Sequence, residues 1–218
     1  MNTYGSGAET IRIDQFESTG PERRPALVLL HGSGGAVSYW SGRFAPTLAQ
    51  FDMGLYAPHY FDKTGTQRAT AETILDGRHF PAWLAAIEDA VEYVAARPGV
   101  HPDRIGVLGI PLGGYLAVAL GTQSGTQHRR VRAVVELSGG MPPGWEGRLS
   151  PATPPVLVLH GAKDTLVPVS EAQKLESLLE QHGVPHQVEI FANETHWFSQ
   201  SAQPRLLMTC AGFLSRYL

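Results

Sequence analysis

Short apolar segments alternate along the chain with longer amphipathic ones. Continuous apolar runs rich in Val, Ile and Leu are typical of strands that are buried on both faces of a parallel sheet. Residues 9–17 and 186–192 instead alternate polar and apolar side chains, which predicts an antiparallel strand leading into the sheet and a strand near a sheet edge. The continuous runs are residues 26–32, 53–58, 104–110, 131–138 and 155–161.

Between the strands, apolar residues recur at the spacing of amphipathic helices. One helix is predicted over residues 80–94. A second is predicted to begin in a capping box of Ser170 with Gln173 and to end at Gly183, and a third covers about residues 203–217. The alternation of buried strands with helices predicts an α/β fold: a doubly wound, mostly parallel sheet flanked by helices.

The chain reads as a single domain, residues 1–218, because no repeat, heptad pattern or low-complexity segment divides it. Residues 141–155 contain five prolines, yet strong strand patterns flank them on both sides. We interpret this segment as a long loop within the domain. Since it joins two strands over the edge of the sheet where ligands bind, it is a candidate lid or pocket wall.

Composition and charge exclude several classes of function. Lys and Arg number 17 against 20 Asp and Glu, which gives a net charge of −3 and none of the basic excess of a nucleic-acid-binding protein. No apolar stretch approaches the roughly 18 residues of a membrane span, and the first residues lack a secretory signal pattern. We therefore expect a soluble, cytoplasmic protein without a membrane or nucleic-acid partner; its oligomeric state stays open.

Metal ligands and cofactor motifs are weakly represented. The single cysteine, Cys210, excludes an internal disulfide and a cysteine-based zinc site, and its position in a helix predicts a buried thiol. His182 and His186 are four residues apart, but the glycine and proline between them break the helix that would align them, so no metal site is expected. No phosphate loop or dinucleotide fingerprint is present, and we expect no cofactor.

The residues directly after the buried strands are the candidates for chemistry, because ligands of such sheets bind at the carboxyl ends of the strands. After the first buried strand comes HGSGG, residues 31–35. Small residues there allow backbone N–H groups to approach a substrate oxygen, as an oxyanion hole requires. A tight glycine turn without a ligand is an equal alternative.

Residues 109–114, GIPLGG, have the frame of the strand–elbow–helix motif G-x-S-x-G. With these residues the sequence resembles the dienelactone hydrolase family of the α/β-hydrolase superfamily, and the resemblance extends over nearly the whole chain. It is carried by LVLLHGSGG, YFDKTG, HPDRIGVLG, LHGAKDTLVP and ETHWF.

The resemblance implies a compact α/β-hydrolase fold without a large cap domain and a hydrolase of small esters or lactones. It places the family's acid at Asp164, its histidine at His196 and its nucleophile position at Pro111. The oxyanion hole then falls at Ser33, Gly34 and Leu112.

Pro111 departs from the family pattern, because proline has no nucleophilic atom and cannot form an acyl-enzyme. Proline also prefers a backbone φ near −65°, so we expect the elbow to be relaxed, while the connection from strand to helix is retained. Ser33 and Ser138 are the hydroxyls that could replace the nucleophile, although each is better interpreted as a loop or wall residue.

Asp164 and His196 can still form a general acid–base, because an Asp that accepts from one imidazole nitrogen orients the ring and raises the basicity of the other nitrogen. Glu136, in an otherwise apolar strand, either lines the pocket or, as we favour, forms a structural ion pair. The possible pocket residues are Trp40, His59, Tyr60, Glu136, Ser138, Trp145 and Trp197.

Three hypotheses for the function follow. The favoured one is a non-hydrolytic enzyme, a cyclase, isomerase or lyase, in which His196 and Asp164 move protons on a small carbonyl substrate. The second is an ester or lactone hydrolase that activates water directly or uses another serine. The third is a binding protein that uses the cleft without chemistry.

Overall fold

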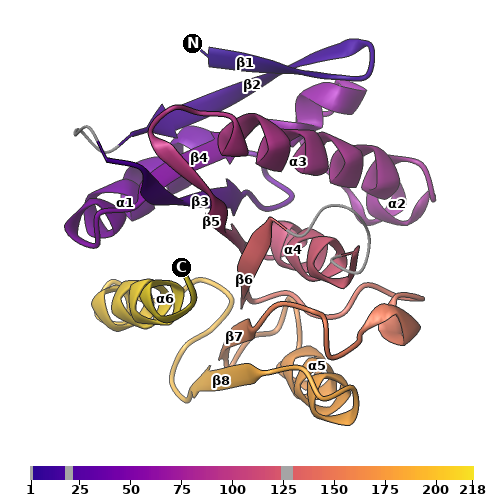
Figure 1. The fold of residues 1–218 in the computed structure, drawn as a ribbon. Helices are drawn as coiled ribbons and strands as arrows, with labels where there is room; N and C mark the ends of the chain where they lie inside the picture. The colour runs from indigo at the N-terminus through magenta and orange to yellow at the C-terminus, as the bar shows by residue number, and fades with distance from the viewer. Residues whose placement is uncertain (1, 18–21, 124–129) are drawn as a thin grey trace.

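A single eight-stranded sheet organises the computed structural model, which describes residues 2–17, 22–123 and 130–218. The strand order is β1-β2-β4-β3-β5-β6-β7-β8, from top to bottom in Figure 1. β1 and β2 pair antiparallel, as do β2 and β4, and every later pairing is parallel. The predicted α/β fold with a mostly parallel sheet is confirmed.

The predicted strands and helices are present with small shifts of their ends. The strands are β1 (Asn2–Ser6), β2 (Glu9–Phe16), β3 (Arg24–Leu30), β4 (Gly54–Pro58), β5 (Val100–Gly109), β6 (Val131–Leu137), β7 (Val156–Gly161) and β8 (His186–Phe191). The α-helices are α1 (Val37–Gln50), α2 (Ala71–Leu75), α3 (His79–Ala95), α4 (Leu112–Thr122), α5 (Ser170–Gln181) and α6 (Gln203–Tyr217). The 3₁₀ helices are η1 (Tyr60–Thr64) and η3 (Glu146–Arg148).

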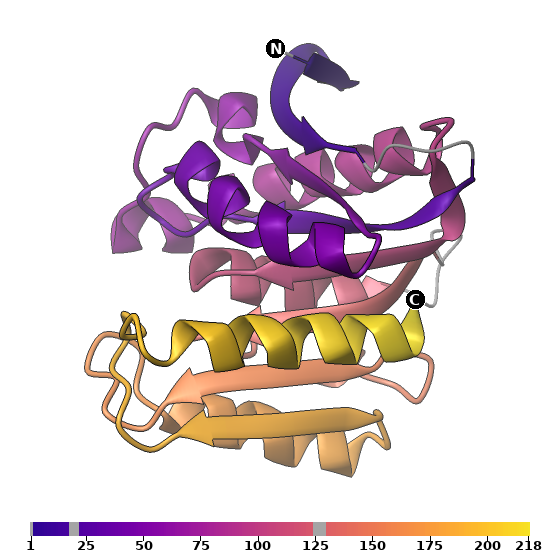
Figure 2. The same ribbon diagram turned by 90° about the vertical axis from the view of Figure 1, so that its left-hand side faces the viewer.

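Helices cover both faces of the sheet. Figure 1 shows α1 and α6 on one face and α3, α4 and α5 on the other, and Figure 2 looks onto the face that carries α1 and α6. Along β3, Val28 and Leu30 pack into one core cluster, whereas Leu27 and Leu29 pack into the other. Because both faces are covered, the strand is buried from Pro25 to Leu30, which explains the continuous apolar run in the sequence.

Four local features differ from or refine the sequence predictions. The capping box at Ser170 is wrong: Ser170 is the first residue of α5, and the preceding Val169 is the N-cap without a side-chain bond. Gly183 follows α5 with φ of 66°, as predicted for the residue after a helix. β1 was missed because Asn2–Ser6 has almost no apolar content, and β5 begins four residues earlier than expected, at Val100.

Among the described residues, no helix combines the length and the apolar character that a membrane-spanning segment requires.

Candidate active site

His196 and Asp164 meet at the carboxyl edge of the sheet. Asp164 lies in the loop after β7, and His196 lies between β8 and α6. The Nδ1 atom of His196 is 2.7 Å from Oδ2 of Asp164, and the side chains are 8% and 0% exposed. With Nδ1–H donating to the carboxylate, the lone pair of Nε2 is left for a partner outside the pair.

The Asp164 carboxylate is fixed by its own loop. Its Oδ1 accepts hydrogen bonds from the backbone N–H groups of Leu166 and Val167, both at 2.9 Å. Nε2 of His160, a buried residue of β7, lies 2.9 Å from the carbonyl oxygen of Val167 and 3.4 Å from Oδ2 of Asp164. His160 was not singled out from the sequence, although a buried histidine at a strand end four residues before the acid was a usable signal.

Pro111 occupies the tight turn between β5 and α4. A Cβ atom on Gly109 would overlap the backbone of Gly113, and one on Gly113 would overlap the carbonyl of Leu30, so the two glycines let three backbone segments touch. Pro111 is the N-cap of α4 with φ of −19° and ψ of −68°. The connection is retained as predicted, but relaxation to the usual proline φ near −65° is wrong, because this close packing fixes the backbone path.

Three backbone N–H groups beside Pro111 lack an acceptor within the described part of the chain: those of Ser33, Gly34 and Leu112. All three residues line one cavity together with His196. The N–H of Leu112 is at the positive end of the α4 dipole. Such groups can stabilise a developing oxyanion.

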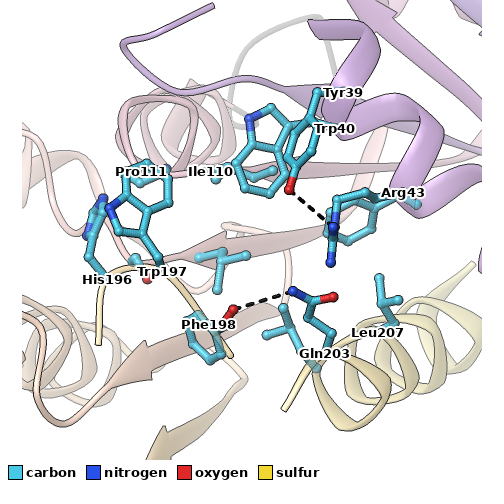
Figure 3. Close-up of a pocket in the computed structure, with 14 residues that line it drawn as sticks. Tyr39, Trp40, Arg43, Ile110, Pro111, His196, Trp197, Phe198, Gln203 and Leu207 are labelled. Carbon is cyan, nitrogen blue, oxygen red and sulfur yellow. Dashed lines mark hydrogen bonds between the residues drawn. The ribbon is translucent and has the colours of Figure 1, made fainter. Parts of the chain in front are cut away.

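Two cavities flank Pro111 and His196 and share Trp40 and Trp197 as walls. The smaller, of about 110 Å³, lies between α1 and α6 and is drawn in Figure 3, with Trp197 beside His196. The inner cavity, as we name the second, measures about 580 Å³ and lies between the HGSGG loop and the loop after Asp164. The cleft is therefore large enough for a small organic molecule.

Ser138 lines the smaller cavity, as do Pro111 and His196. It follows β6 with φ of 57°, a conformation that non-glycine residues rarely adopt. Its side-chain hydroxyl is buried and has no hydrogen-bond partner among the described residues. A strained backbone with an unpaired hydroxyl beside a histidine is a common sign of a functional position.

Two predicted pocket residues do not reach the cleft. His59 pairs with Asp14 at 3.0 Å, away from the cavities around His196. Tyr60 is fully buried, stacks on His31 and donates to the carbonyl of His31 at 2.7 Å. Both follow β4, but η1 begins there and folds their side chains back into the protein.

Trp145 of the 141–155 segment lines a third cavity, the outer cavity, of about 760 Å³. Met141, Pro142 and Pro143 of the same segment are also walls of it. The outer and inner cavities share five wall residues and therefore adjoin one another. These are Ile74, Leu112, Tyr115, Leu166 and Val167.

Glu136 is fully buried, lines none of the cavities described above and forms no ion pair with another described residue, so both predictions for it are wrong. It lies beneath the first turn of α4, where one carboxylate oxygen is 3.0 Å from the position of a Cβ on Gly114. Its Oε1 accepts from the backbone N–H of Gly139, and its Oε2 has no partner in the described chain. Burial raises the pKa of this carboxyl to about 8.

The described residues contain one cluster with metal-ligand character, and it lies outside the cleft. Ligand atoms of Glu176, Glu180 and His186 are within 4.8 Å of one another where α5 faces β8. Exposed groups of this kind are frequent in proteins without a bound ion. Cys210 is buried as predicted, and burial raises the pKa of its thiol to about 12, so it does not supply a thiolate.

Comparison with known proteins decides the family. The model of the dienelactone hydrolase family matches residues 15–210, which is most of the chain. The chain belongs to the dienelactone hydrolase family.

Individual relatives of this dienelactone hydrolase family member are distant. "Putative carboxymethylenebutenolidase" of Synechocystis is 26% identical over 53% of this chain and 48% of its own length. Dipeptidyl-peptidase 5 of Schizosaccharomyces pombe is 28% identical over 86% of this chain and 32% of its own length. The chain thus spans half or less of the length of these relatives. The crystal structure of the dienelactone hydrolase-like promiscuous phosphotriesterase P91, from metagenomic libraries, aligns with a TM-score of 0.83 at 20% identity, over 99% of this chain and 96% of that one.

Replacing the buried carboxyl with Glu136→Gln is expected to flatten the pH dependence of stability. The ordinary pKa of glutamate is 4.5, and the folded value is about 8. Between these values the unfolded chain loses the proton while the folded chain keeps it, so the unfolding free energy falls by up to about 1.4 kcal/mol per pH unit as pH rises. The amide carries no such charge, so we expect the variant to exceed the wild type by at least about 2 kcal/mol at pH 8 and to match it near pH 4.5.

Urea unfolding of the two proteins at pH 4.5, 6 and 8 measures this difference. Glu72→Gln, an exposed position on α2, serves as the control and should keep the wild-type slope. Parallel pH profiles for the wild type and Glu136→Gln would contradict the assignment of a neutral buried carboxyl.

Proposed function

We propose that this protein is an enzyme of non-hydrolytic acid–base chemistry, cyclisation, isomerisation or elimination, on a small carbonyl compound. The observation that carries the proposal is the paired His196 and Asp164 beside a turn whose residue, Pro111, has no nucleophilic atom. In this proposal Pro111 stands at the family's nucleophile position. No acyl-enzyme can then form there, while the groups that move a proton remain.

The proposed chemistry needs only groups of this chain. Nε2 of His196 removes a proton from the carbon next to the substrate carbonyl, and Asp164 stabilises the imidazolium through Nδ1. The electron pair moves onto the carbonyl oxygen as an enolate. The N–H groups of Ser33, Gly34 and Leu112 hold that oxygen. The imidazolium then returns the proton to another atom of the substrate, or the enolate expels a leaving group.

Hydrolysis is the second candidate, and two observations favour it. The chain belongs to the dienelactone hydrolase family, whose name refers to the hydrolysis of a lactone. Ser138 offers an unpaired hydroxyl on a strained backbone in the same cavity as His196. Its Oγ would attack the ester carbonyl while His196 takes its proton; alternatively His196 would activate water directly. Binding without chemistry, the third hypothesis, predicts ligand affinity with no turnover.

His196→Ala is expected to lower the rate of proton transfer by about 10²–10⁴-fold, the usual contribution of a positioned general base. The assay is deuterium exchange of the protons next to the carbonyl in a panel of ketones, esters and lactones, followed by NMR. Asp164→Asn should also lose most of the activity, because the amide no longer orients the ring in the same tautomer. Equal exchange rates for wild type and His196→Ala across the panel would refute the proposal.

Ser138→Gly separates the two candidates. Glycine suits the φ of 57° and removes the hydroxymethyl side chain without straining the backbone. A non-hydrolytic enzyme should keep its α-proton exchange in this variant. If instead the wild type hydrolyses activated esters, forms an acyl adduct on Ser138 by mass spectrometry and loses both in Ser138→Gly, the hydrolase candidate is correct.

A further inference from the structure

The outer cavity combines apolar walls with two polar groups that have no partner. Its walls include residues of α2, α4 and α5, which lie on the same face of the sheet (Figure 1), and it shares wall residues with the inner cavity, which His196 also lines. Its apolar walls come from four separate segments, so it is a formed pocket and not a bare helix surface. They include Ile74, Phe80, Leu112, Met141 and Trp145.

Glu171, in the first turn of α5, brings a carboxylate to this cavity. Its side chain forms no ion pair or hydrogen bond within the described residues. The Glu171 carboxylate and the Tyr115 ring both lie beside Gly140. A Cβ atom added to Gly140 would be 3.3 Å from the ring of Tyr115 and 3.4 Å from Oε2 of Glu171. The phenol of Tyr115 likewise has no partner in the described chain, and burial and the nearby Glu171 raise its pKa. An unpaired carboxylate and an unpaired phenol therefore face the same space.

The neighbouring cations are already engaged. Lys174, also on the wall, pairs with Glu146 at 3.2 Å. The guanidinium of Arg148 lies 4.0 Å over the ring of Trp145. Glu171 is thus the carboxylate of the cavity that still lacks a counter-charge. The inner cavity has the opposite character, because its wall carries Arg68 and no carboxylate.

We propose that the outer cavity is a substrate-binding site for an apolar group that carries an ammonium, held by Glu171 and Tyr115. The proposal rests on the function proposed above, and it deepens that function by naming the substrate class: a carbonyl compound whose reactive end lies at His196 and whose aminoalkyl end lies at Glu171. A partly buried carboxylate binds a cation by charge-assisted hydrogen bonds, which are about twice as strong as neutral ones. Aromatic rings around it add attraction for the same charge.

Calorimetric titration with three probes of equal length tests this proposal: 4-phenylbutylamine, 4-phenylbutan-1-ol and 4-phenylbutanoate. We expect the amine to bind the wild type at least about tenfold more tightly than the alcohol, and the carboxylate to bind most weakly. Glu171→Gln should cost the amine about tenfold in affinity or more and leave the alcohol within about threefold. Glu180→Gln, which removes a charge from an exposed position of the same helix, is the matched control and should bind all three as the wild type does.

The outcome is independent of the chemistry at His196. The same titrations in His196→Ala should give the wild-type order of affinities, because that residue does not line the outer cavity. If His196→Ala leaves turnover intact while Glu171→Gln still weakens amine binding, the proposed chemistry fails and the ammonium site stands. If the amine binds no better than the alcohol, if Glu171→Gln and Glu180→Gln behave alike, or if no probe binds at millimolar concentration, the ammonium site is overturned.

Discussion

Pro111→Ser is expected to create ester hydrolysis at least about 10²-fold above the wild-type rate, because the remaining parts of a hydrolytic site are already in place. The new hydroxyl would stand at the N-cap of α4, in the cavity wall next to His196. Asp164 already orients the imidazole at 2.7 Å, and the N–H of Leu112 directly follows the substituted residue. The measurement is the steady-state hydrolysis of 4-nitrophenyl acetate, with mass spectrometry to detect an acetyl group on the new serine.

Two further variants make the result interpretable. Pro111→Ala removes the ring without adding a nucleophile, and the double variant Pro111→Ser with His196→Ala adds the nucleophile without its base; both should stay near the wild-type rate. Equal activity of Pro111→Ser and Pro111→Ala would mean that the hydroxyl does not reach His196. The dyad would then be placed for a different atom, and the assignment of Pro111 to the nucleophile position would fail.

The sequence was sufficient to place those site residues whose location depends only on the strand that they follow. Asp164 and His196 each follow a strand of a parallel sheet, and parallel strands end at one edge, so their meeting could be predicted without coordinates. The same rule placed the glycine loop and the residues before α4 beside them. The paired strands themselves were predictable because burial on both faces leaves a continuous apolar run, as in β3.

The rule that residues following a strand lie at the site failed where the orientation of the side chain, and not the position of the backbone, decides whether a residue reaches the cleft. His59 and Tyr60 also follow a strand, yet η1 turns them into the interior, where Tyr60 bonds to His31. Glu136 is part of a strand next to the site, but its position in the strand directs it beneath α4. An alternation pattern could not reveal this orientation, since β6 is buried on both faces.

Contacts between side chains of distant elements could not be predicted from the sequence either. Tyr115 and Glu171 are 56 positions apart and belong to different helices, so no spacing in the sequence relates them. The spacing of His160 and Asp164 was a usable signal, but the 3.4 Å approach of their side chains depends on the turn through Leu166 and Val167. The φ of 57° at Ser138 likewise depends on how β6 ends against the sheet. A serine in the sequence does not indicate such a backbone conformation.

Gly109→Ala is expected to lower the unfolding free energy by about 4 kcal/mol or more, or to prevent folding, because this position is at the crossing of two backbone segments. A Cβ there would overlap the carbonyl of Gly113 in the first turn of α4, and a backbone group cannot rotate away as a side chain can. Urea unfolding followed by circular dichroism measures the loss in whatever soluble fraction is obtained.

The control for this prediction is Gly212→Ala, in the middle of α6. A Cβ at Gly212 meets nothing within 4 Å, so the change there reports only helix propensity and should stabilise the protein by about 0.5–1 kcal/mol. The two variants add the same methyl group, but the expected changes in unfolding free energy have opposite signs. The comparison therefore separates the steric effect at the turn from the general effect of replacing glycine. If Gly109→Ala is as stable as the wild type, the turn before α4 can move its backbone apart. The close approach that fixes Pro111 beside His196 would then not be a rigid feature of the site, and the gain of hydrolysis expected for Pro111→Ser would lose its structural basis.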